Sequence, residues 1–224
     1  MMNAARADTV VIAIAKGRIL ENTVPVLAAV GIVPIDDPRS SRKLVCDTCQ
    51  QNVRLVVVRA ADVPTYVQFG AADLGIVGKD VLMEYGGMDL YELLDLGFAR
   101  CRLVVAEPAA LAARDDPTRW RRLRIATKYV KITQEHFARK GIQTEIIKLY
   151  GSMELAPLAG LADRIVDLVA SGATLRANHL VEVEHIADIS ARLVANKAAM
   201  KVKSFTLKPM VAQIGAEIGR YEPE

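Results

Sequence analysis

The chain has 224 residues, of which 52% are hydrophobic and only 5% aromatic, and its formal net charge is +3. This length suits one large or two small domains with an aliphatic core, and so mild a charge does not indicate a nucleic-acid-binding protein. The sequence shows neither an export signal nor an apolar run long enough to span a bilayer, so we expect a cytoplasmic protein that binds no membrane and no nucleic acid.

The three cysteines include one Cys-x-x-Cys pair, Cys46 and Cys49. A zinc site would need two further ligands at matched spacing, and a thioredoxin-like motif would place the pair at the start of a helix. Here a strand-like run, 55–58, follows instead. We therefore favour a hairpin turn over a metal or redox site, and the odd cysteine count fits a reducing compartment.

Strand-like and helix-like patterns alternate along nearly the whole chain. The expected strands are 10–15, 44–45, 55–58, 73–77, 102–106, 123–126, 144–149, 165–169 and 180–186. The expected helices lie at 19–30, between Asp62 and Gly70, at 81–85 after an Asp80 cap, between Thr133 and Gly141, at 155–162 and at 189–200, with a final amphipathic helix that carries Val211, Ile214 and Ile218. This alternation predicts an α/β fold with mainly parallel sheets.

The chain also has two places where it could divide into lobes. Gly97 loosens the connection near residues 96–100, and a second break is expected near 176–179. Lobe I would then consist of residues 1–97 plus 180–224, and lobe II of residues 98–179. A cleft between two such lobes is the expected ligand site.

The most informative segment is the apolar run 165–169, followed at once by the small residues 170–174. Such a loop at the carboxyl end of a strand can direct several backbone N–H groups and the hydroxyls of Ser171 and Thr174 toward one anion. Asp167, still on the strand, could accept hydrogen bonds from sugar hydroxyls. The segment therefore suggests a ribose phosphate site, although an ordinary turn with Gly172 as its hinge explains the same residues.

Two further strand ends carry glycine with charged residues, Lys16-Gly17-Arg18 and Gly78-Lys79-Asp80. Because ligands gather at the carboxyl ends of strands in open α/β sheets, these turns could bind a second phosphorylated substrate. Each turn is equally explained as local structure, and Lys79 as a solvated surface residue.

A basic segment surrounds Trp120. It comprises Arg114, Arg119, Arg121, Arg122, Arg124, Lys128 and Lys131. We favour a solvated surface, and the alternatives are a site for polyphosphate, an acidic partner or RNA.

No nucleophile and base stand together in the sequence, and His136, His179 and His185 are scattered. This pattern favours chemistry by substrate positioning and charge stabilisation over a covalent intermediate, so we assign no catalytic residue. Transfer at the anomeric carbon of a sugar, with pyrophosphate leaving and Mg²⁺ on the diphosphate, has that character.

Taken together, these motifs resemble the ATP phosphoribosyltransferase family across roughly residues 10–200. The resemblance is carried by Glu154, Gly160, Ala162, Ile165, Asp167-Leu168, Ser171-Gly172 and Thr174-Leu175, and by the segments 12–18, 59–64, 70–80, 126–129 and 196–197. It implies two lobes like those of type II periplasmic binding proteins. It also implies transfer of the phosphoribosyl group of phosphoribosyl pyrophosphate to N1 of ATP, the first step of histidine biosynthesis.

The resemblance also implies roles for individual residues. The 5-phosphate would be held by Ser171, Gly172, Ala173 and Thr174, the ribose hydroxyls by Asp167, and Glu154 would lie near the ribose or its metal. The polyphosphates would face Lys16, Arg18 and Arg59, and the cleft would be lined by Asp73, Gly78, Lys79 and Asp80. Metal ligands remain open, since Mg²⁺ would bind mainly through substrate phosphates.

The length resembles that of the short form of this family. That form implies a homodimer or a hetero-oligomer with a regulatory subunit similar to histidyl-tRNA synthetase. The alternative function is a two-lobed small-anion binding or sensor protein without catalysis, because fold does not determine function.

Overall fold

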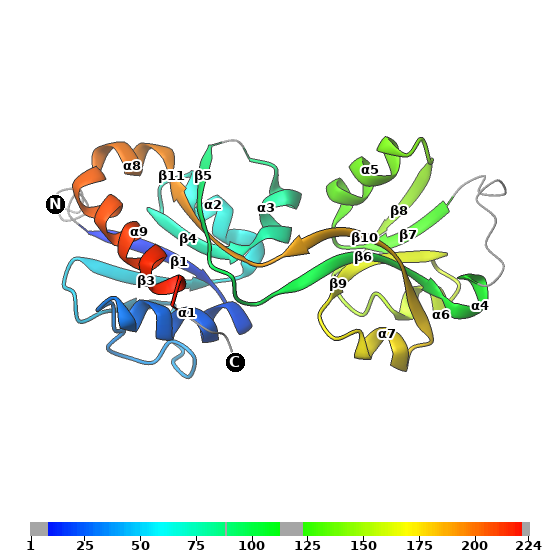
Figure 1. Ribbon diagram of the computed structural model, residues 1–224, viewed down its shortest axis with the longest axis horizontal. Helices are drawn as coiled ribbons and strands as arrows, with labels where there is room; N and C mark the ends of the chain where they lie inside the picture. The colour runs from blue at the N-terminus through cyan, green and yellow to red at the C-terminus, as the bar shows by residue number, and fades with distance from the viewer. Residues whose placement is uncertain (1–8, 88, 113–122, 221–224) are drawn as a thin grey trace. The chain divides into compact units, whose positions relative to one another are not determined.

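The computed structural model describes residues 9–87, 89–112 and 123–220 of the chain. The chain forms two compact units (Figure 1). Unit 1 comprises Met1–Ala99 and Ser190–Glu224, and unit 2 comprises Arg100–Ile189.

Unit 1 is built on a six-stranded sheet with the order β2-β3-β1-β4-β11-β5. Its strands are β1 (Val10–Ala15), β2 (Val45–Asp47), β3 (Val53–Val58), β4 (Leu74–Gly78), β5 (Leu90–Asp95) and β11 (Ala191–Asn196). Strand β1 pairs in parallel with β3 and β4, whereas β2, β11 and β5 join antiparallel. The central strands β1, β3 and β4 therefore end at one common edge.

Helices cover both faces of this sheet because its central strands are apolar on both sides. The helices are α1 (Arg18–Ala29), α2 (Val63–Gln68, after the 3₁₀ turn Ala60–Asp62), α3 (Lys79–Tyr85), α8 (Lys197–Val202) and α9 (Ser204–Ile218). On one face Ile12 and Ile14 pack into the core with α1 and α9 residues, among them Leu27 and Leu207. On the other face Ala13 packs with residues of α2.

Unit 2 contains a five-stranded sheet with the order β10-β6-β9-β7-β8. Its elements are β6 (Cys101–Pro108), α4 (Ala109–Ala112), β7 (Leu123–Thr127), α5 (Val130–Arg139), β8 (Thr144–Lys148), α6 (Leu155–Leu158), β9 (Arg164–Val169), α7 (Ala173–Ala177) and β10 (Leu180–Ile189). Helix α5 lies on one face of the sheet, and α6 and α7 lie on the other (Figure 1). Strands β7, β8 and β9 are mutually parallel. We name the edge of the sheet where their carboxyl ends meet the site-bearing edge.

The α/β class is confirmed, but the expectation of mainly parallel sheets is wrong. In the described part of the chain four strand pairings are parallel and five antiparallel. The second expected lobe boundary is also wrong, since the chain returns to unit 1 at Ser190 and not at residue 180. The reason is that β10 pairs with β6 along its whole length, from Leu180 opposite Pro108 to Ile189 opposite Cys101. The cleft expected between the lobes stays a prediction.

The expected helix 189–200 is largely the strand β11. Leu193 packs on one face of the sheet and Val194 on the other, so its run is apolar at consecutive positions, which periodicity cannot distinguish from a buried helix. Strand β5, which pairs with β11, was not expected. Two helices begin earlier than predicted: Asp80 lies in the first turn of α3, and Thr133 lies inside α5, where its hydroxyl donates to the Tyr129 carbonyl.

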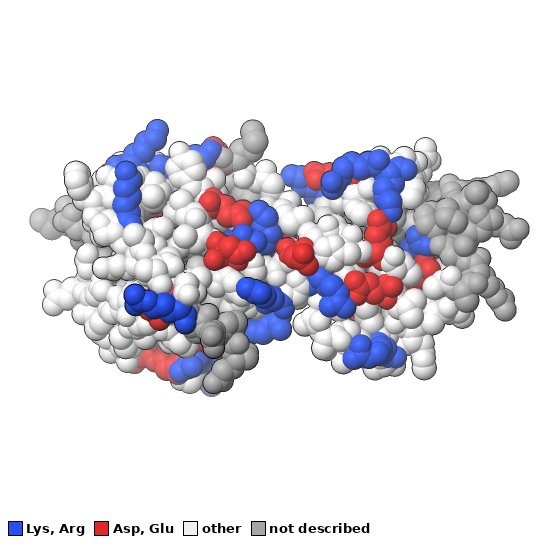
Figure 2. Space-filling view, in the orientation of Figure 1, with Lys and Arg blue, Asp and Glu red and all other residues white. Residues whose placement is uncertain are grey.

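Acidic and basic side chains are interspersed on the visible face of each unit (Figure 2). Within the basic segment, Arg114, Arg119, Trp120, Arg121 and Arg122 lie outside the described residues. None of the helices that are described is long and apolar enough to cross a bilayer.

Arg124, the remaining arginine of that segment, clamps β7 to β9. Its backbone N–H donates to Asp163 Oδ2 at 2.9 Å, its guanidinium lies 2.8 Å from Asp163 Oδ1, and its Nη1 donates to the Gly160 carbonyl. Burial would raise the pKa of Asp163, but the hydrogen bonds from Arg124 outweigh it and hold that pKa below the ordinary value of 3.8. Arg124 therefore has a structural role next to the strand that carries the site.

This clamp predicts an acid-dependent stability. Because the folded pKa of Asp163 is lowered, its contribution is present above the unfolded pKa and is lost as the pH falls below 3.8. We expect Arg124→Met to lower the free energy of unfolding by about 1 kcal/mol at pH 7, with a smaller difference from wild type near pH 3. Urea unfolding at both pH values measures this. Arg54→Met, which breaks the exposed Arg54–Asp47 pair, is the control, and a deficit that is equal at both pH values would contradict the prediction.

Candidate functional site

The site-bearing edge of unit 2 carries three loops that follow β7, β8 and β9. Because these strands are parallel, their carboxyl ends Thr127, Lys148 and Val169 lie at the same edge of the sheet. The loops therefore converge where ligands bind in open α/β sheets.

A cavity of about 240 Å³ opens at this edge. It is lined by Glu154, Asp167, Leu168, Val169, Ala170, Ser171, Gly172, Ala173, Thr174 and Leu175. The structure thus brings together all six residues that the family resemblance assigned to the sugar-phosphate site. Leu168, Val169, Ala170 and Leu175 are additional lining residues whose contribution the residue types did not reveal.

The 170–174 loop turns sharply at Gly172, which has a φ of +73° and precedes α7. A side chain is strained in this left-handed region, and an added Cβ would also lie 3.0 Å from Arg176 Nη1. The Ser171 hydroxyl accepts the Ala173 N–H at 3.3 Å. The N–H groups of Thr174 and Leu175 have no protein acceptor among the described residues, so the loop presents donors to an anion.

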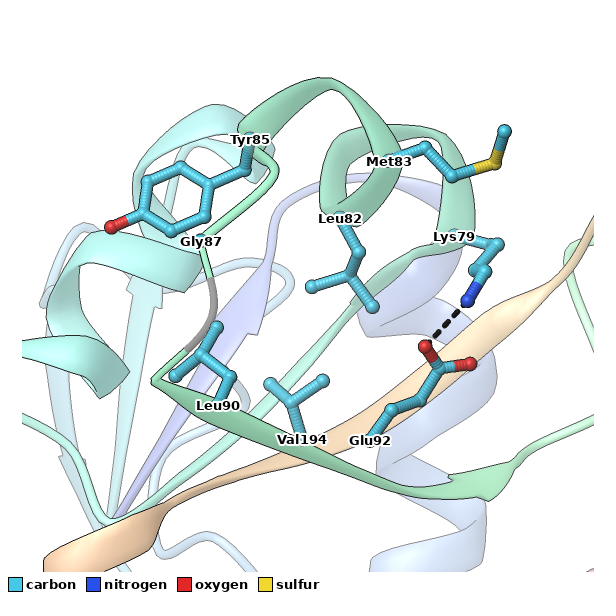
Figure 3. A pocket seen from close by; sticks show the side chains of 8 residues that line it. All are labelled: Lys79, Leu82, Met83, Tyr85, Gly87, Leu90, Glu92 and Val194. Atoms are coloured by element: carbon cyan, nitrogen blue, oxygen red, sulfur yellow. Dashed lines mark hydrogen bonds and ion pairs between the residues drawn. The ribbon is translucent and has the colours of Figure 1, made fainter. Parts of the chain in front are cut away.

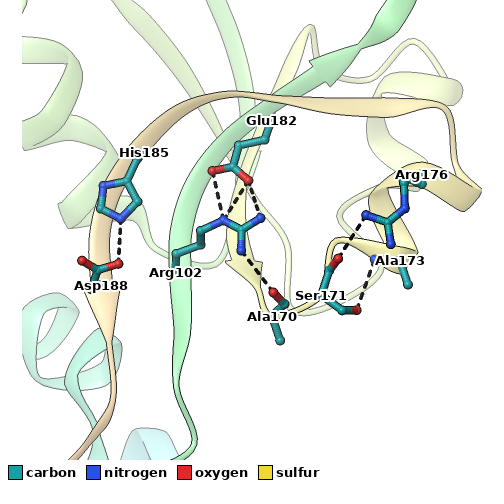
Figure 4. A network of polar contacts seen from close by, with 8 residues as sticks. All are labelled: Arg102, Ala170, Ser171, Ala173, Arg176, Glu182, His185 and Asp188. Carbon is teal, nitrogen blue, oxygen red and sulfur yellow. Dashed lines mark hydrogen bonds and ion pairs between the residues drawn. The ribbon is translucent and has the colours of Figure 1, made fainter. Parts of the chain in front are cut away.

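Two arginines support this loop (Figure 4). Arg102 Nη1 donates to the Ala170 carbonyl and Arg176 Nη1 to the Ser171 carbonyl, each at 3.1 Å. Arg102 is itself paired with Glu182 on β10, and this hydrogen bond raises the pKa of the guanidinium. Neither arginine was expected from the sequence. The support by Arg102 depends on the pairing of β6 with β10 and β9, which leaves no local pattern.

Asp167 supplies the carboxylate of the cavity. Its Oδ1 accepts the Leu168 N–H at 2.8 Å, which orients the side chain. Lys128, the first residue after β7, places its Nζ 3.9 Å from the same oxygen. Glu154 lines the cavity from the start of α6, so two carboxylates and one ammonium group lie beside the 170–174 loop.

The Lys16 turn of unit 1 borders a separate cavity of about 240 Å³. Gly17 has a φ of +84° and turns the chain from β1 into α1. The lining residues are Lys16, Gly17, Leu20, Glu21, Pro38, Arg39, Ser41 and Val57. Lys16 and the Ser41 hydroxyl suit a phosphate group, whereas Arg39 is already bonded to the Asp37 carboxylate through Nε and Nη2. Arg39 and Ser41 were not expected, whereas Arg18 and Arg59 stand at the starts of α1 and the 3₁₀ turn and do not line this cavity.

The Gly78-Lys79-Asp80 turn is occupied by contacts within unit 1 (Figure 3). Lys79 Nζ lies 2.6 Å from Glu92 Oε2, at the side of a smaller pocket of about 140 Å³. Asp80 is buried and folds back over Gly78, where an added Cβ would lie 2.2 Å from Asp80 Oδ1. Neither Gly78 nor Asp80 lines a described pocket, so this turn has a structural explanation.

Asp73 does not lie at the carboxyl edge of the sheet. It precedes β4, at the opposite end, where its Oδ2 accepts the Val11 N–H and its carboxylate pairs with Lys203 at 2.9 Å. The structure therefore does not bring Asp73 together with the Gly78-Lys79-Asp80 turn, because the strand β4 separates them.

The Cys-x-x-Cys segment is a hairpin, as expected: Cys46 is buried on β2 and paired in register with Leu55 on β3. Its cysteines are not joined in a disulfide. Among the residues that the structure describes, no three His, Cys, Asp or Glu side chains form a metal-binding group. A metal at the unit 2 cavity would thus meet few protein ligands, Glu154 and Asp167 being the carboxylates that line it.

Comparison with solved structures identifies close matches to this architecture. The ATP phosphoribosyl transferase (HisG:HisZ) complex from Thermotoga maritima contains a chain that superimposes with a TM-score of 0.83 at 31% identity, covering 95% of this chain and 100% of that one. The periplasmic aliphatic sulphonate binding protein SsuA from Escherichia coli matches with a TM-score of 0.59 at 12% identity, over 95% of this chain and 73% of its own. The second likeness concerns the fold alone and confirms the periplasmic-binding-protein class.

Relatives found by sequence share more identical residues with this chain than these two solved structures do. The ATP phosphoribosyltransferase of Acidithiobacillus ferrooxidans is 58% identical over 209 residues, which are 93% of this chain and 97% of the relative. That of Burkholderia mallei is 58% identical over 200 residues, 89% of this chain and 92% of its own. The model of the family HisG: ATP phosphoribosyltransferase matches residues 59–216. With this match and these relatives, the chain belongs to the ATP phosphoribosyltransferase family.

Proposed function

We propose that this chain transfers the phosphoribosyl group of phosphoribosyl pyrophosphate to N1 of ATP, and that phosphoribosyl pyrophosphate binds in the unit 2 cavity. The products are phosphoribosyl-ATP and pyrophosphate, and the reaction is the first step of histidine biosynthesis. One observation carries the proposal: a single cavity gathers the 170–174 loop, Asp167 and Glu154.

The 170–174 loop binds the 5-phosphate in this proposal. It offers the N–H groups of Thr174 and Leu175 and the hydroxyls of Ser171 and Thr174. Arg102 and Arg176 hold the loop through its carbonyl oxygens, so its donors are oriented before the phosphate arrives. Such preorganisation lowers the entropy lost on binding.

Asp167 accepts hydrogen bonds from the ribose hydroxyls, and Glu154 lies beside them. During the reaction the C1–O bond breaks with its electron pair passing to pyrophosphate, while N1 of ATP donates a lone pair to C1 and the adenine amino group loses a proton to solvent. Positive charge develops on the ring in the transition state. A fixed carboxylate close to that charge lowers the barrier without a covalent intermediate.

On unit 1, we propose that Lys16, Arg18 and Arg59 bind the phosphates of ATP. Lys16 lines a cavity, and Arg18 follows the Gly17 turn. Arg39 and Lys79 are less suited to this role, because Asp37 and Glu92 already pair with their charges.

The family uses a divalent metal ion, and we propose Mg²⁺. The sparse carboxylates of the unit 2 cavity, Glu154 and Asp167, fit an ion that Mg²⁺-binding proteins typically hold with one or two carboxylates plus substrate phosphates. When bound, Mg²⁺ would neutralise charge on the departing pyrophosphate.

We further propose a cytoplasmic hetero-oligomer with a regulatory subunit related to histidyl-tRNA synthetase, built on a homodimer of this chain. The matched Thermotoga maritima chain comes from a HisG:HisZ complex, and three cysteines without a disulfide suit a reducing compartment.

The decisive experiment is turnover. We expect phosphoribosyl-ATP to form from ATP and phosphoribosyl pyrophosphate with Mg²⁺, monitored by absorbance, and the rate to rise with a HisZ-type subunit. Binding of phosphoribosyl pyrophosphate with no product, with or without that subunit, would instead support a non-catalytic anion-binding protein.

Asp167→Asn is expected to weaken phosphoribosyl pyrophosphate binding about 10- to 100-fold, because hydrogen bonds to a charged acceptor contribute about 1.5–3 kcal/mol. The dissociation constant for ATP should change less than twofold. Calorimetric titration of both substrates measures this. Asp188→Asn, on the exposed β10 pair with His185, is the control, and an equal loss for both substrates would remove the ribose role of Asp167.

Gly172→Ala is expected to weaken phosphoribosyl pyrophosphate binding about tenfold, because strain of about 1–2 kcal/mol in the left-handed region would distort the 170–174 loop. Gly141→Ala is the matched control, since Gly141 has a φ of +71° and open space around its Cβ position. Both variants should lose similar thermal stability. If Gly141→Ala weakened binding as much, the effect would be one of general stability.

A further inference from the structure

Lys128 stands beside the proposed sugar-phosphate site but has no role in it so far. It directly follows β7, and its Nζ lies 3.9 Å from Asp167 Oδ1 and 4.8 Å from the centre of the Tyr129 ring. The ring is buried, whereas the Lys128 side chain is 40% exposed. The ammonium group is therefore held between an aromatic face and a carboxylate, with one side toward solvent.

The three cations around the cavity differ in what they bind. Arg102 donates to Glu182 and to the Ala170 carbonyl, and Arg176 donates to the Ser171 carbonyl. Lys128 contacts Asp167 only beyond hydrogen-bond distance. Of these three cations, only Lys128 makes no hydrogen bond to another protein group among the described residues, so its donors are available to a ligand.

Strand register places Lys128 level with Asp167. Strands β7 and β9 are parallel neighbours with Thr127 opposite Val166, so the next residues, Lys128 and Asp167, also lie opposite each other. The 170–174 loop follows on the β9 side. A ligand with its phosphate in that loop and its sugar on Asp167 would thus reach Lys128 with the groups next to the sugar hydroxyls.

In phosphoribosyl pyrophosphate those groups are the pyrophosphate oxygens. The 5-phosphate is attached at one end of the ribose, and the pyrophosphate is attached to C1, next to the 2-hydroxyl. We infer that Lys128 binds the pyrophosphate of phosphoribosyl pyrophosphate, an inference that rests on the proposed function of this cavity. As the C1–O bond breaks, its electron pair passes to pyrophosphate, and the ammonium group stabilises the negative charge that accumulates there.

The test compares two ligands that differ only in the pyrophosphate. For Lys128→Met we expect the dissociation constant of phosphoribosyl pyrophosphate to rise about tenfold, equivalent to about 1.4 kcal/mol. The constant for ribose 5-phosphate should stay within twofold of wild type, and inhibition by inorganic pyrophosphate should weaken. Lys128→Arg should restore most of the affinity, because it keeps a cation at the same position.

Lys131→Met is the control, since Lys131 lies on α5 and faces Glu135 at 3.9 Å; it should leave both constants unchanged. Equal weakening of both ligands by Lys128→Met, or no weakening of either, would overturn the role of Lys128 while leaving the cavity assignment intact. Failure of the wild-type chain to bind either ligand would overturn the proposed function itself, and this inference with it.

Discussion

The parallel pairing of β9 with β7 is the constraint on which the unit 2 cavity depends. Its register sets Thr127 opposite Val166, and this brings Asp167, the 170–174 loop and Lys128 to one edge of the sheet. Arg124 and Asp163 clamp the same two strands at their opposite ends. A shift of one residue would turn Asp167 to the other face of the sheet, so the contacts of Arg124 with Asp163 maintain the geometry of the site. As a partly exposed ion pair, they contribute only modestly to stability.

The sequence could group residues where they are close along the chain. The loop after β9 is contiguous with its strand, and the backbone requirement at Gly172 can be read from the residue type. Glu154, which the family resemblance supplied, lines the same cavity. Sequence reasoning failed where the environment is set by distant segments. Lys79 could not be recognised as paired, because Glu92 lies on β5, a strand that the pattern did not reveal. The pairing of Asp73 was equally hidden, because its partner, Lys203, comes from the far end of the chain.

The same distinction explains the errors in the fold. A strand covered on both faces loses the alternation that identifies it, and β11 therefore reads as a helix. Strand β10 was recognised, but its partner was not, because long antiparallel pairing with β6 leaves no local signature. Its assignment to unit 2 matters for function, since Glu182 on β10 orients Arg102, which in turn supports the 170–174 loop.

Basic residues near an anion site therefore divide according to what they already bind. Arg102, Arg124 and Arg176 are bonded to backbone carbonyls within unit 2, and Arg102 and Arg124 also bind the carboxylates of Glu182 and Asp163. Their charges contribute to the electrostatic potential of unit 2, but their hydrogen bonds hold segments of the protein in place. A lysine carries a single compact charge on a flexible stem. Lys128, held near Asp167 without a hydrogen bond to it, can thus exchange a weak contact for a phosphate oxygen without unfolding any part of the scaffold.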